Sequence, residues 1–546
     1  MTAVVPPSNS AQQDVTDDAV SGAELRLERL DAWCEKWGDW CNPILVKETR
    51  QALKSRQFVI TFSLLLFAAL SWTIIGTFSL MPAIYETPSA PRMMLGYYFV
   101  LALPMLLVVP LAAYRSLEGE IDDGTLELLS ITTLSPKQVV WGKLASAMLQ
   151  MLLYFVVLFP CVSYAYTLRG VDFPTTVVLL GMLILAGIMM TIVALFFAPL
   201  SRSRTGRVTM LLVVIMLLAV AEWLLGLAAV EMITSDASWW SWEDSVLYEN
   251  SVLYLGGLVL LVAPAVGYLL LTVTAAQLTP VIDNRSTKIR FAMLLVNAAV
   301  VAWVTLASTE RQTYTALGLM CCAGMGLILL WGLASSMLVS ESAVLTPRVQ
   351  RGLPQSFLAR ATLTWLAPGP ATGLVFATLN VWLLVGLMRA GVSYFFGDGN
   401  TFNVREEQIL LQFGFAVASY LTFFLVLVYG LMRLLRRKNN PRVEVGLAAF
   451  VVVAVFASLG PYGIQLYLND FLDFPYSYWQ ATNWVWTLYS VADGVDCYPV
   501  IKGIGVIGAL GVLGIMCLNP AIVRPRRIAT PKRVLEERAM KALDQD

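Results

Sequence analysis

Long apolar runs separated by short polar segments dominate this chain. About 20 consecutive apolar residues cross roughly 30 Å of hydrocarbon as a helix. Twelve runs reach that length, and they predict an all-α polytopic membrane protein with about twelve transmembrane helices, divisible into two halves of six. The runs are 58–80, 94–114, 141–165, 175–199, 208–230, 252–274, 291–307, 314–339, 369–388, 409–431, 443–464 and 500–519.

The basic residues between these runs are distributed unevenly. If both termini lie on one side, the opposite side carries six of the 37 Lys and Arg residues, and the remaining 31 share the side of the termini. Loops rich in Lys and Arg stay in the cytoplasm. The pattern therefore predicts an even number of spans with both termini cytoplasmic. The six outer cations are Arg92, Arg169, Arg311, Arg389, Arg405 and Lys502.

Composition removes several kinds of chemistry. Charged residues make up 14% of the chain and hydrophobic ones 58%, whereas a soluble domain is about 25% charged. The chain has no histidine, which is the commonest metal ligand and general base. Its seven cysteines show no C-x-x-C spacing, so we expect neither a disulfide framework nor a metal site. No cofactor is expected, and the polar N-terminus does not resemble a secretory leader.

The segment before the first span has amphipathic character. Residues 1–24 are polar and expected to be disordered. Within 25–57, a helical projection of PILVKETRQALKSRQF places Leu45, Val46, Thr49, Ala52 and Leu53 on one face and most charged residues, Glu48 included, on the other. This predicts a helix along the inner leaflet; a plain basic flank is the alternative. The basic residues of this elbow are Lys47, Arg50, Lys54 and Arg56.

An acidic stretch, LEGEIDDGTLELLSITTLSPKQVVWGKL, follows the second span. Five carboxylates cannot lie in lipid, because each costs roughly 2.5–3.5 kcal/mol at the bilayer centre. A short helix is expected to start at Gly124 and Thr125 and to stop before Pro136. Leucines beside acids on the cytoplasmic face indicate a surface for a partner protein, and a solvated loop is the alternative. The acids are Glu118, Glu120, Asp122, Asp123 and Glu127.

These two segments together resemble the permease subunits of type-2 ATP-binding-cassette (ABC) transporters. In that family an acid precedes Gly-Thr-Leu-Glu by four residues, and a Pro and a Gly-Lys pair follow. The matching positions here are Glu120, Gly124, Thr125, Leu126, Glu127, Pro136, Gly142 and Lys143.

The resemblance implies an elbow helix before the first span and a coupling helix between spans 2 and 3. The coupling helix would dock on a separate ATPase subunit, which acts as a dimer. Basic groups of that subunit would face Glu118, Glu120 and Glu127, and Leu126 and Leu129 would fill its groove. The resemblance also implies an exporter in a bacterial plasma membrane.

The chain is not expected to hydrolyse ATP itself. No GxxxxGK[ST] motif is present, and the longest polar segment, residues 1–57, is too short for an ordinary nucleotide-binding domain. Enzymatic activity is therefore expected on the partner subunit, and no nucleic-acid partner is expected.

The domain organisation follows from the spans. We expect a disordered tail (1–24), interfacial helices (25–57), a six-span permease domain (58–274), a cytoplasmic linker (275–290), a second six-span domain (291–519) and a basic tail (520–546). Aromatic, acidic outer loops follow spans 5 and 11, consistent with a repeat or with an interfacial aromatic belt. The loop after span 8 stands where a second coupling helix would belong, but it is basic and lacks the Gly-Thr-Leu-Glu motif. Either a single chain supplies both halves of the pore, or only the first half is the standard permease and the chain pairs with a second copy or with a different permease.

Charged residues inside the spans are almost absent. Glu222 in span 5 is the exception and a candidate polar site. Proton- or sodium-coupled carriers usually contain several intramembrane acids, so a secondary carrier is disfavoured. The alternative to a permease is a membrane enzyme or assembly factor with an outer aromatic and acidic site. Its candidate acids are Asp470, Asp473, Asp493 and Asp496.

Overall fold

The structure of the chain is a computed structural model. The structure describes residues 43–82, 87–124, 135–168, 170–171, 173–200, 203–234, 256–280, 283–308, 313–342, 350, 356, 364–396, 404–437, 443–472, 475–519 and 536.

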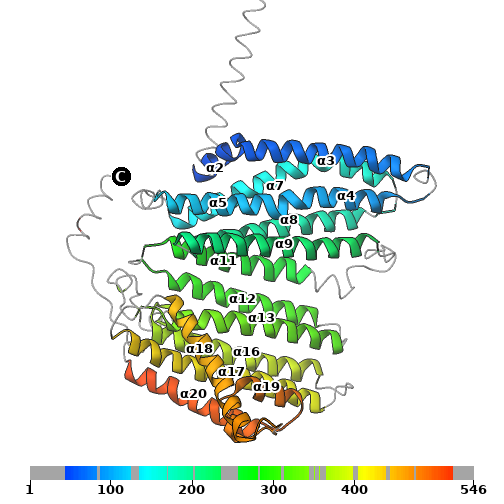
Figure 1. The fold of residues 1–546 in the computed structure, drawn as a ribbon. Helices are drawn as coiled ribbons and strands as arrows, with labels where there is room; N and C mark the ends of the chain where they lie inside the picture. The colour runs from blue at the N-terminus through cyan, green and yellow to red at the C-terminus, as the bar shows by residue number, and fades with distance from the viewer. Residues whose placement is uncertain are drawn as a thin grey trace, which may run out of the picture. The chain divides into compact units, whose positions relative to one another are not determined.

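The described residues form helices and connecting turns (Figure 1). The α-helices are α2 (Pro43–Lys54), α3 (Arg56–Leu80), α4 (Ala90–Ala102), α5 (Val109–Asp122), α7 (Pro136–Thr167), α8 (Phe173–Phe197), α9 (Arg204–Thr234), α11 (Ala263–Leu278), α12 (Ser286–Ala307), α13 (Thr313–Val339), α16 (Pro370–Phe396), α17 (Val404–Leu435), α18 (Val443–Leu468), α19 (Trp484–Ala492) and α20 (Tyr498–Leu518). Short π-helices are η2 (Leu103–Val108) and η5 (Leu258–Val262), and short 3₁₀-helices are η3 (Ala198–Leu200) and η6 (Tyr478–Gln480).

Twelve helices in the described ranges are long and apolar enough to cross a bilayer. This confirms the prediction of an all-α polytopic membrane protein with about twelve spans. The second span runs from Ala90 to Asp122, eight residues beyond the predicted end at 114. The third begins at Pro136, five residues before its predicted start. Both extensions carry charged residues, which form helix readily outside the hydrocarbon.

The chain divides into two compact units. The first comprises residues 1–244 and 273–278, and the second comprises residues 245–272 and 279–546.

In the first unit, the continuous helix α4–η2–α5 is the most buried span. Met93, Leu101, Met105 and Leu117 are almost fully buried along it. Helices α3, α7, α8 and α9 run alongside it (Figure 1). Pro104 lies in the π-turn, where the N–H of Val109 bonds to the Pro104 carbonyl. A π-turn accommodates a residue that lacks an N–H within a continuous span.

In the second unit, α17 is the most buried span. It packs closely against α20, where Gly505, Gly508 and Gly511 face α17. A Cβ on Gly508 would lie 3.1 Å from the backbone nitrogen of Phe423. Small residues at every third position allow the two backbones to approach this closely.

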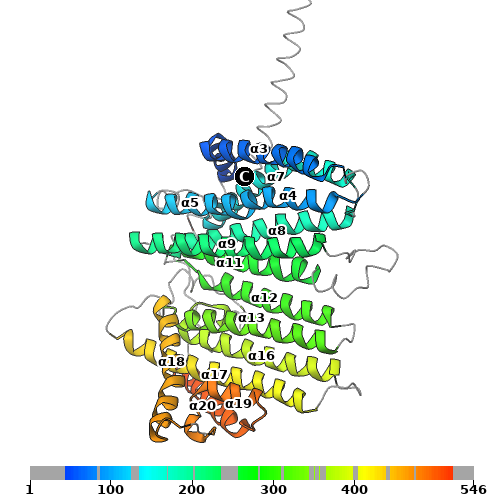
Figure 2. The ribbon, with the colours of Figure 1, turned by 45° about the vertical axis from the view of Figure 1, so that its right-hand side comes forward.

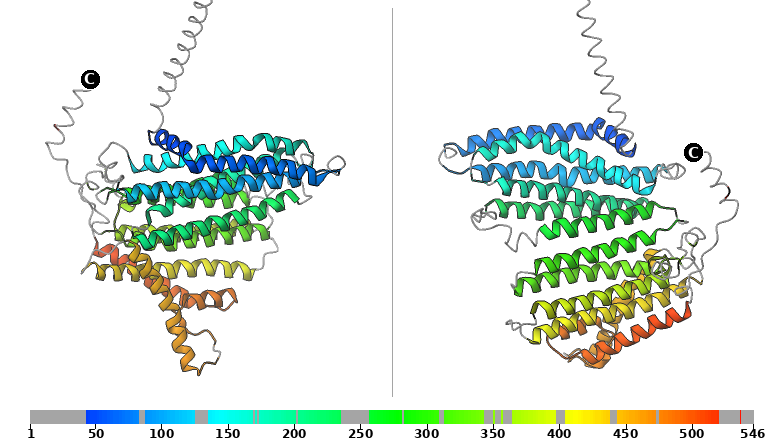
Figure 3. Two further views of the ribbon diagram at one scale, coloured as in Figure 1. Left: turned by 45° about the horizontal axis from the view of Figure 1, so that its top comes forward. Right: turned by 180° about the vertical axis from the view of Figure 1, so that it is seen from behind.

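Helix α18 is oriented differently from its neighbours in the second unit. It packs against α13 and α17 at a steep angle, whereas α13, α16 and α17 run side by side (Figures 2 and 3). Gly446 lies near the start of α18, and a Cβ there would overlap the Ser340 side chain. The absence of a side chain at Gly446 therefore permits the crossing.

Candidate coupling site

Helix α2 ends in a capped break before the first span. The Ser55 backbone is extended, and its Oγ accepts a hydrogen bond from the N–H of Phe58 at 3.1 Å. A serine N-cap satisfies one of the free amides at a helix start, so α3 begins at Arg56 as a separate helix. Ile44 and Glu48, one turn apart on α2, are buried, and this face of α2 packs against α7.

The acidic residues after the second span continue its helix. Helix α5 runs to Asp122, and the N–H of Asp123 bonds to the Gly119 carbonyl at 2.9 Å. Gly124 follows with a φ of +65°, which is the left-handed conformation common directly after a helix. The glycine of the Gly-Thr-Leu-Glu motif therefore ends α5.

Helix α7 has a well-defined start. Ser135 and Gln138 form a reciprocal capping box, and Pro136 occupies the first turn. A proline there costs no hydrogen bond because that amide has no helical partner. The start of α7 thereby fixes Gly142 and Lys143 two turns into the helix, where both are buried.

The Lys143 ammonium joins α2, α5 and α7. Its side chain is 1% exposed. Its Nζ lies 3.1 Å from Glu48 Oε1 on α2 and 3.2 Å from Glu120 Oε1 on α5. The same Nζ donates to Ser116 Oγ at 2.7 Å, and Ser116 donates to Glu48 Oε2 at 3.1 Å. Lys47 lies 3.5 Å from Glu120. We call these five residues the Lys143 cluster.

The burial of the Lys143 cluster determines its energetic role. The side chains of Glu48 and Glu120 are only 11% and 15% exposed. Removing one partner of such a pair leaves an uncompensated buried charge, at a cost of about 3–5 kcal/mol. The two cations balance the two anions. The cluster therefore links the end of α5 and the start of α7 to α2.

Other residues of the predicted site lie on, or next in sequence to, the helices of the Lys143 cluster. Glu118 is half-buried and accepts a hydrogen bond from Tyr114, and Asp122 pairs with Arg207 of α9. Arg50, Lys54 and Arg56 are exposed. Thr125, Leu126, Glu127 and Leu129 lie outside the described residues, so the predicted coupling helix does too.

Sequence reasoning missed two members of the cluster. The projection of the elbow placed Glu48 on its polar face, but Glu48 is buried against Lys143. Ser116 precedes Glu120 by four residues, so both lie on one face of a helix. That spacing was the available signal. The partner of Glu48 is 95 positions away and has no local signature.

A family comparison covers the whole cluster. Residues 42–248 match the family model described as ABC-2 family transporter protein. These residues form an ABC-2 type permease domain. Every residue of the Lys143 cluster belongs to this ABC-2 domain, and residues 249–546 lie outside the match. No curated protein and no solved structure matches the chain.

The predicted intramembrane acid also lies in the ABC-2 domain. Glu222 is half-buried on α9, close enough to the Tyr98 hydroxyl for an electrostatic interaction. Tyr98 donates to the Leu225 carbonyl of the same helix at 3.4 Å.

The second unit has a buried ion pair of its own, outside the ABC-2 match. Arg290 near the start of α12 is fully buried and donates to Glu341 Oε2 at 2.7 Å. It also donates to the carbonyls of Trp365 and Ala367, at 2.8 and 2.7 Å. The N–H of Gly369 donates to Glu341 at 2.8 Å. We call these residues the Arg290 cluster; it joins the ends of α12 and α13 to the turn before α16.

A polar network orders the connection between α18 and α20. Gln480 donates to Gln465 at 2.6 Å, and Asn483 donates to Gln480 at 2.9 Å. Burial raises the pKa of Tyr476 to about 12. Burial, aided by the Asp496 carboxylate, also raises the pKa of the Cys497 thiol. Both groups therefore stay protonated and uncharged near neutral pH.

The acids of the alternative outer site lie near this network. Asp470 and Asp493 are exposed, and Asp496 accepts a hydrogen bond from the N–H of Tyr498 at 3.1 Å. Asp473 lies outside the described residues. Among the residues that the structure describes, no three His, Cys, Asp or Glu side chains could hold a metal ion together.

Proposed function

We propose that this chain is the membrane-spanning permease of an ATP-driven exporter. A separate ATPase subunit, acting as a dimer, docks on residues 125–134, and hydrolysis of ATP drives movement of a substrate across the membrane. The proposal extends to a bacterial plasma membrane with both termini in the cytoplasm. The Lys143 cluster is the observation that carries it, because a coupling segment needs a rigid attachment to the spans it moves.

The geometry supports a specific route for force. Residues 125–134 connect Gly124 to Ser135, and the helices on both sides are held by one buried ammonium. A displacement of this segment cannot separate α5 from α7 without leaving a buried charge unpaired, which is costly. The segment, α2, α5 and α7 would therefore move together.

The acids of this region then divide into two roles. Glu120 pairs within the chain with Lys143 and Lys47. Its role is therefore to hold α5 against α2 and α7. We propose that Glu127 faces the ATPase together with Leu126 and Leu129. Glu118 is half-buried and accepts a hydrogen bond from Tyr114 within the chain.

Co-purification tests the proposed docking of an ATPase on the segment that contains Glu127. The tagged chain is purified from its native membrane, a P-loop protein in the eluate is identified by mass spectrometry, and ATP hydrolysis is measured. Glu127→Arg is expected to lower both the recovered P-loop protein and the ATPase activity at least tenfold. Glu444→Arg, which reverses an exposed acid on α18, is the matched control and is expected to change neither.

Two outcomes would contradict the proposal. Retention of the P-loop protein and of its activity in Glu127→Arg would refute docking through this segment. A purified chain that transports without any nucleotide-hydrolysing partner would refute the permease assignment as a whole.

A further inference from the structure

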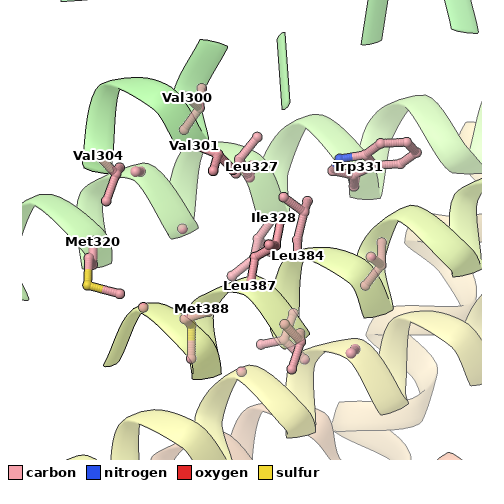
Figure 4. A pocket seen from close by; sticks show the side chains of 18 of the residues that line it. Val300, Val301, Val304, Met320, Leu327, Ile328, Trp331, Leu384, Leu387 and Met388 are labelled. Carbon is pink, nitrogen blue, oxygen red and sulfur yellow. The ribbon is translucent and has the colours of Figure 1, made fainter. Parts of the chain in front are cut away.

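The second unit contains a partly open apolar cavity between its helices. It has a volume of about 160 Å³ and lies between α12, α13, α16 and α17. Figure 4 shows Val300, Leu327, Leu384 and Met388 around a common space. All of its lining residues belong to the second unit.

The chemistry of the lining excludes a polar ligand. Of the 20 lining residues, only Thr305 and Trp331 carry a side-chain oxygen or nitrogen. The Trp331 Nε1 donates to Asn297 Oδ1 at 3.0 Å, and Thr305 Oγ1 donates to the Ala302 carbonyl at 2.9 Å. Neither N–H nor O–H is available to a ligand. An apolar lining of this kind favours apolar molecules over water.

The cavity has a closed end and a more exposed end. Trp331 is 1% exposed and packs against Phe376 with ring centroids 5.8 Å apart, which closes one end. Leu387, another lining residue, is 43% exposed. We therefore place the entrance of the cavity beside Leu387 and its inner end at Trp331.

The size of the cavity sets the length of the ligand. An engineered cavity of about 150 Å³ binds benzene, so this one holds a segment of roughly six carbons. Because the lining helices are long and apolar enough to span a bilayer, the molecules that surround them are lipids. Lipid tails end in unbranched hydrocarbon, which fits a narrow, wholly apolar space.

We propose that this cavity binds the terminal segment of a phospholipid acyl chain from the surrounding bilayer. The proposal does not depend on the Lys143 cluster or on an ATPase partner. It assigns the second unit a lipid-binding site of its own.

Photolabelling tests the assignment. The full chain is reconstituted in nanodiscs of phosphatidylcholine with a diazirine at the end of one acyl chain, and labelled residues are mapped by mass spectrometry. Label is expected on Trp331 and Ile328, which line the cavity. Leu329, 66% exposed and outside the lining, reports ordinary contact with surrounding lipid.

A cavity-filling variant provides the control. A Cβ at Gly324 meets no atom within 4 Å, so Gly324→Leu has space to fill the cavity. It is expected to reduce label on Trp331 at least fivefold and to leave Leu329 unchanged. Gly332→Leu lies on the same helix, also meets open space and does not line the cavity, so it is expected to retain both labels.

A second variant guards against misfolding. Gly391→Leu fills the cavity from α16, where a Cβ would lie 3.6 Å from Met320 Cε, and it should act as Gly324→Leu does. Label on Leu329 without label on Trp331 in the wild type would overturn the proposal. So would equal labelling of Trp331 in the wild type and both filled variants.

Discussion

Lys143 is the residue that links α2, α5 and α7 in the ABC-2 domain. It is a buried cation with two carboxylate partners from two helices and a hydroxyl ligand from Ser116. Buried ion pairs often add little net stability relative to apolar side chains, but a half-removed pair is strongly destabilising. The cluster therefore specifies one arrangement of α2, α5 and α7.

Replacing Lys143 tests this dependence. Lys143→Met is expected to lower the free energy of unfolding by about 3–5 kcal/mol, because Glu48 and Glu120 stay buried without their ammonium. The thermal midpoint in detergent should fall accordingly. Lys54→Met, on the exposed face of α2, should change stability by no more than about 0.5 kcal/mol. A fall of equal size in both variants would contradict the role of the cluster.

Gly124 carries a backbone requirement rather than a packing one. A Cβ there meets no atom within 4 Å, but its φ is +65°. Gly124→Ala is expected to destabilise by about 1–2 kcal/mol through left-handed strain alone. Gly119→Ala in α5 also meets open space and should stabilise by up to about 1 kcal/mol. Thermal midpoints that shift in the same direction would contradict this reading.

Tyr476 and Cys497 predict a dependence of stability on alkaline pH. Burial raises both pKa values above the ordinary values of 10.0 and 9.0. At a pH between the ordinary pKa and the folded-state pKa of each group, the folded state binds more protons than the unfolded state. The free energy of unfolding therefore falls as pH rises above about 9. The double variant Tyr476→Phe with Cys497→Ala should show a flatter decline in thermal midpoint between pH 8 and pH 11.

At the scale of elements, the tight contact between α17 and α20 rests on absent side chains. Gly508→Leu is expected to cost about 1–3 kcal/mol, because the added atoms meet the backbone of Phe423. Gly503→Leu adds the same atoms on the same helix where a Cβ meets nothing within 4 Å. Equal thermal midpoints for the two variants would show that the close contact between α17 and α20 does not determine the cost of Gly508→Leu.

The sequence predicted elements better than their connections. Length and hydropathy gave twelve spans, because a span needs only its own apolar residues. The ends were less accurate, since α5 continues to Asp122 on charged residues that a hydropathy boundary excludes. The pairs Glu48–Lys143 and Arg290–Glu341 were not predicted, because they join residues 95 and 51 positions apart. Such pairing depends on how the helices pack, and no local periodicity records it.

At the scale of the whole molecule, each unit contains a buried ion pair that joins the ends of two of its spans. In the first unit, Glu120 lies near the end of the second span, and Lys143 lies near the start of the third. In the second unit, Glu341 follows the span Gly318–Val339, and Arg290 lies near the start of the span Ser286–Ala307. Each unit therefore links the ends of two of its own spans through a different pair of residues.

The distribution of Lys and Arg predicts where the chain ends lie. A fluorescent protein fused to the C-terminus should fluoresce, and alkaline phosphatase fused there should be inactive, because twelve spans return the chain to the cytoplasm. Phosphatase inserted after Val171, between α7 and α8, should be active. The reverse pattern at either position would contradict the predicted orientation.

The balanced charge of the Lys143 cluster has a consequence for energetics in a polarised membrane. Each elementary charge moved across 100 mV involves about 2.3 kcal/mol of electrical work. Lys47 and Lys143 offset Glu48 and Glu120, so a rigid shift of all four along the membrane normal transfers no net charge. Transmembrane voltage would neither assist nor oppose that shift, and its rate should be the same in polarised and depolarised vesicles.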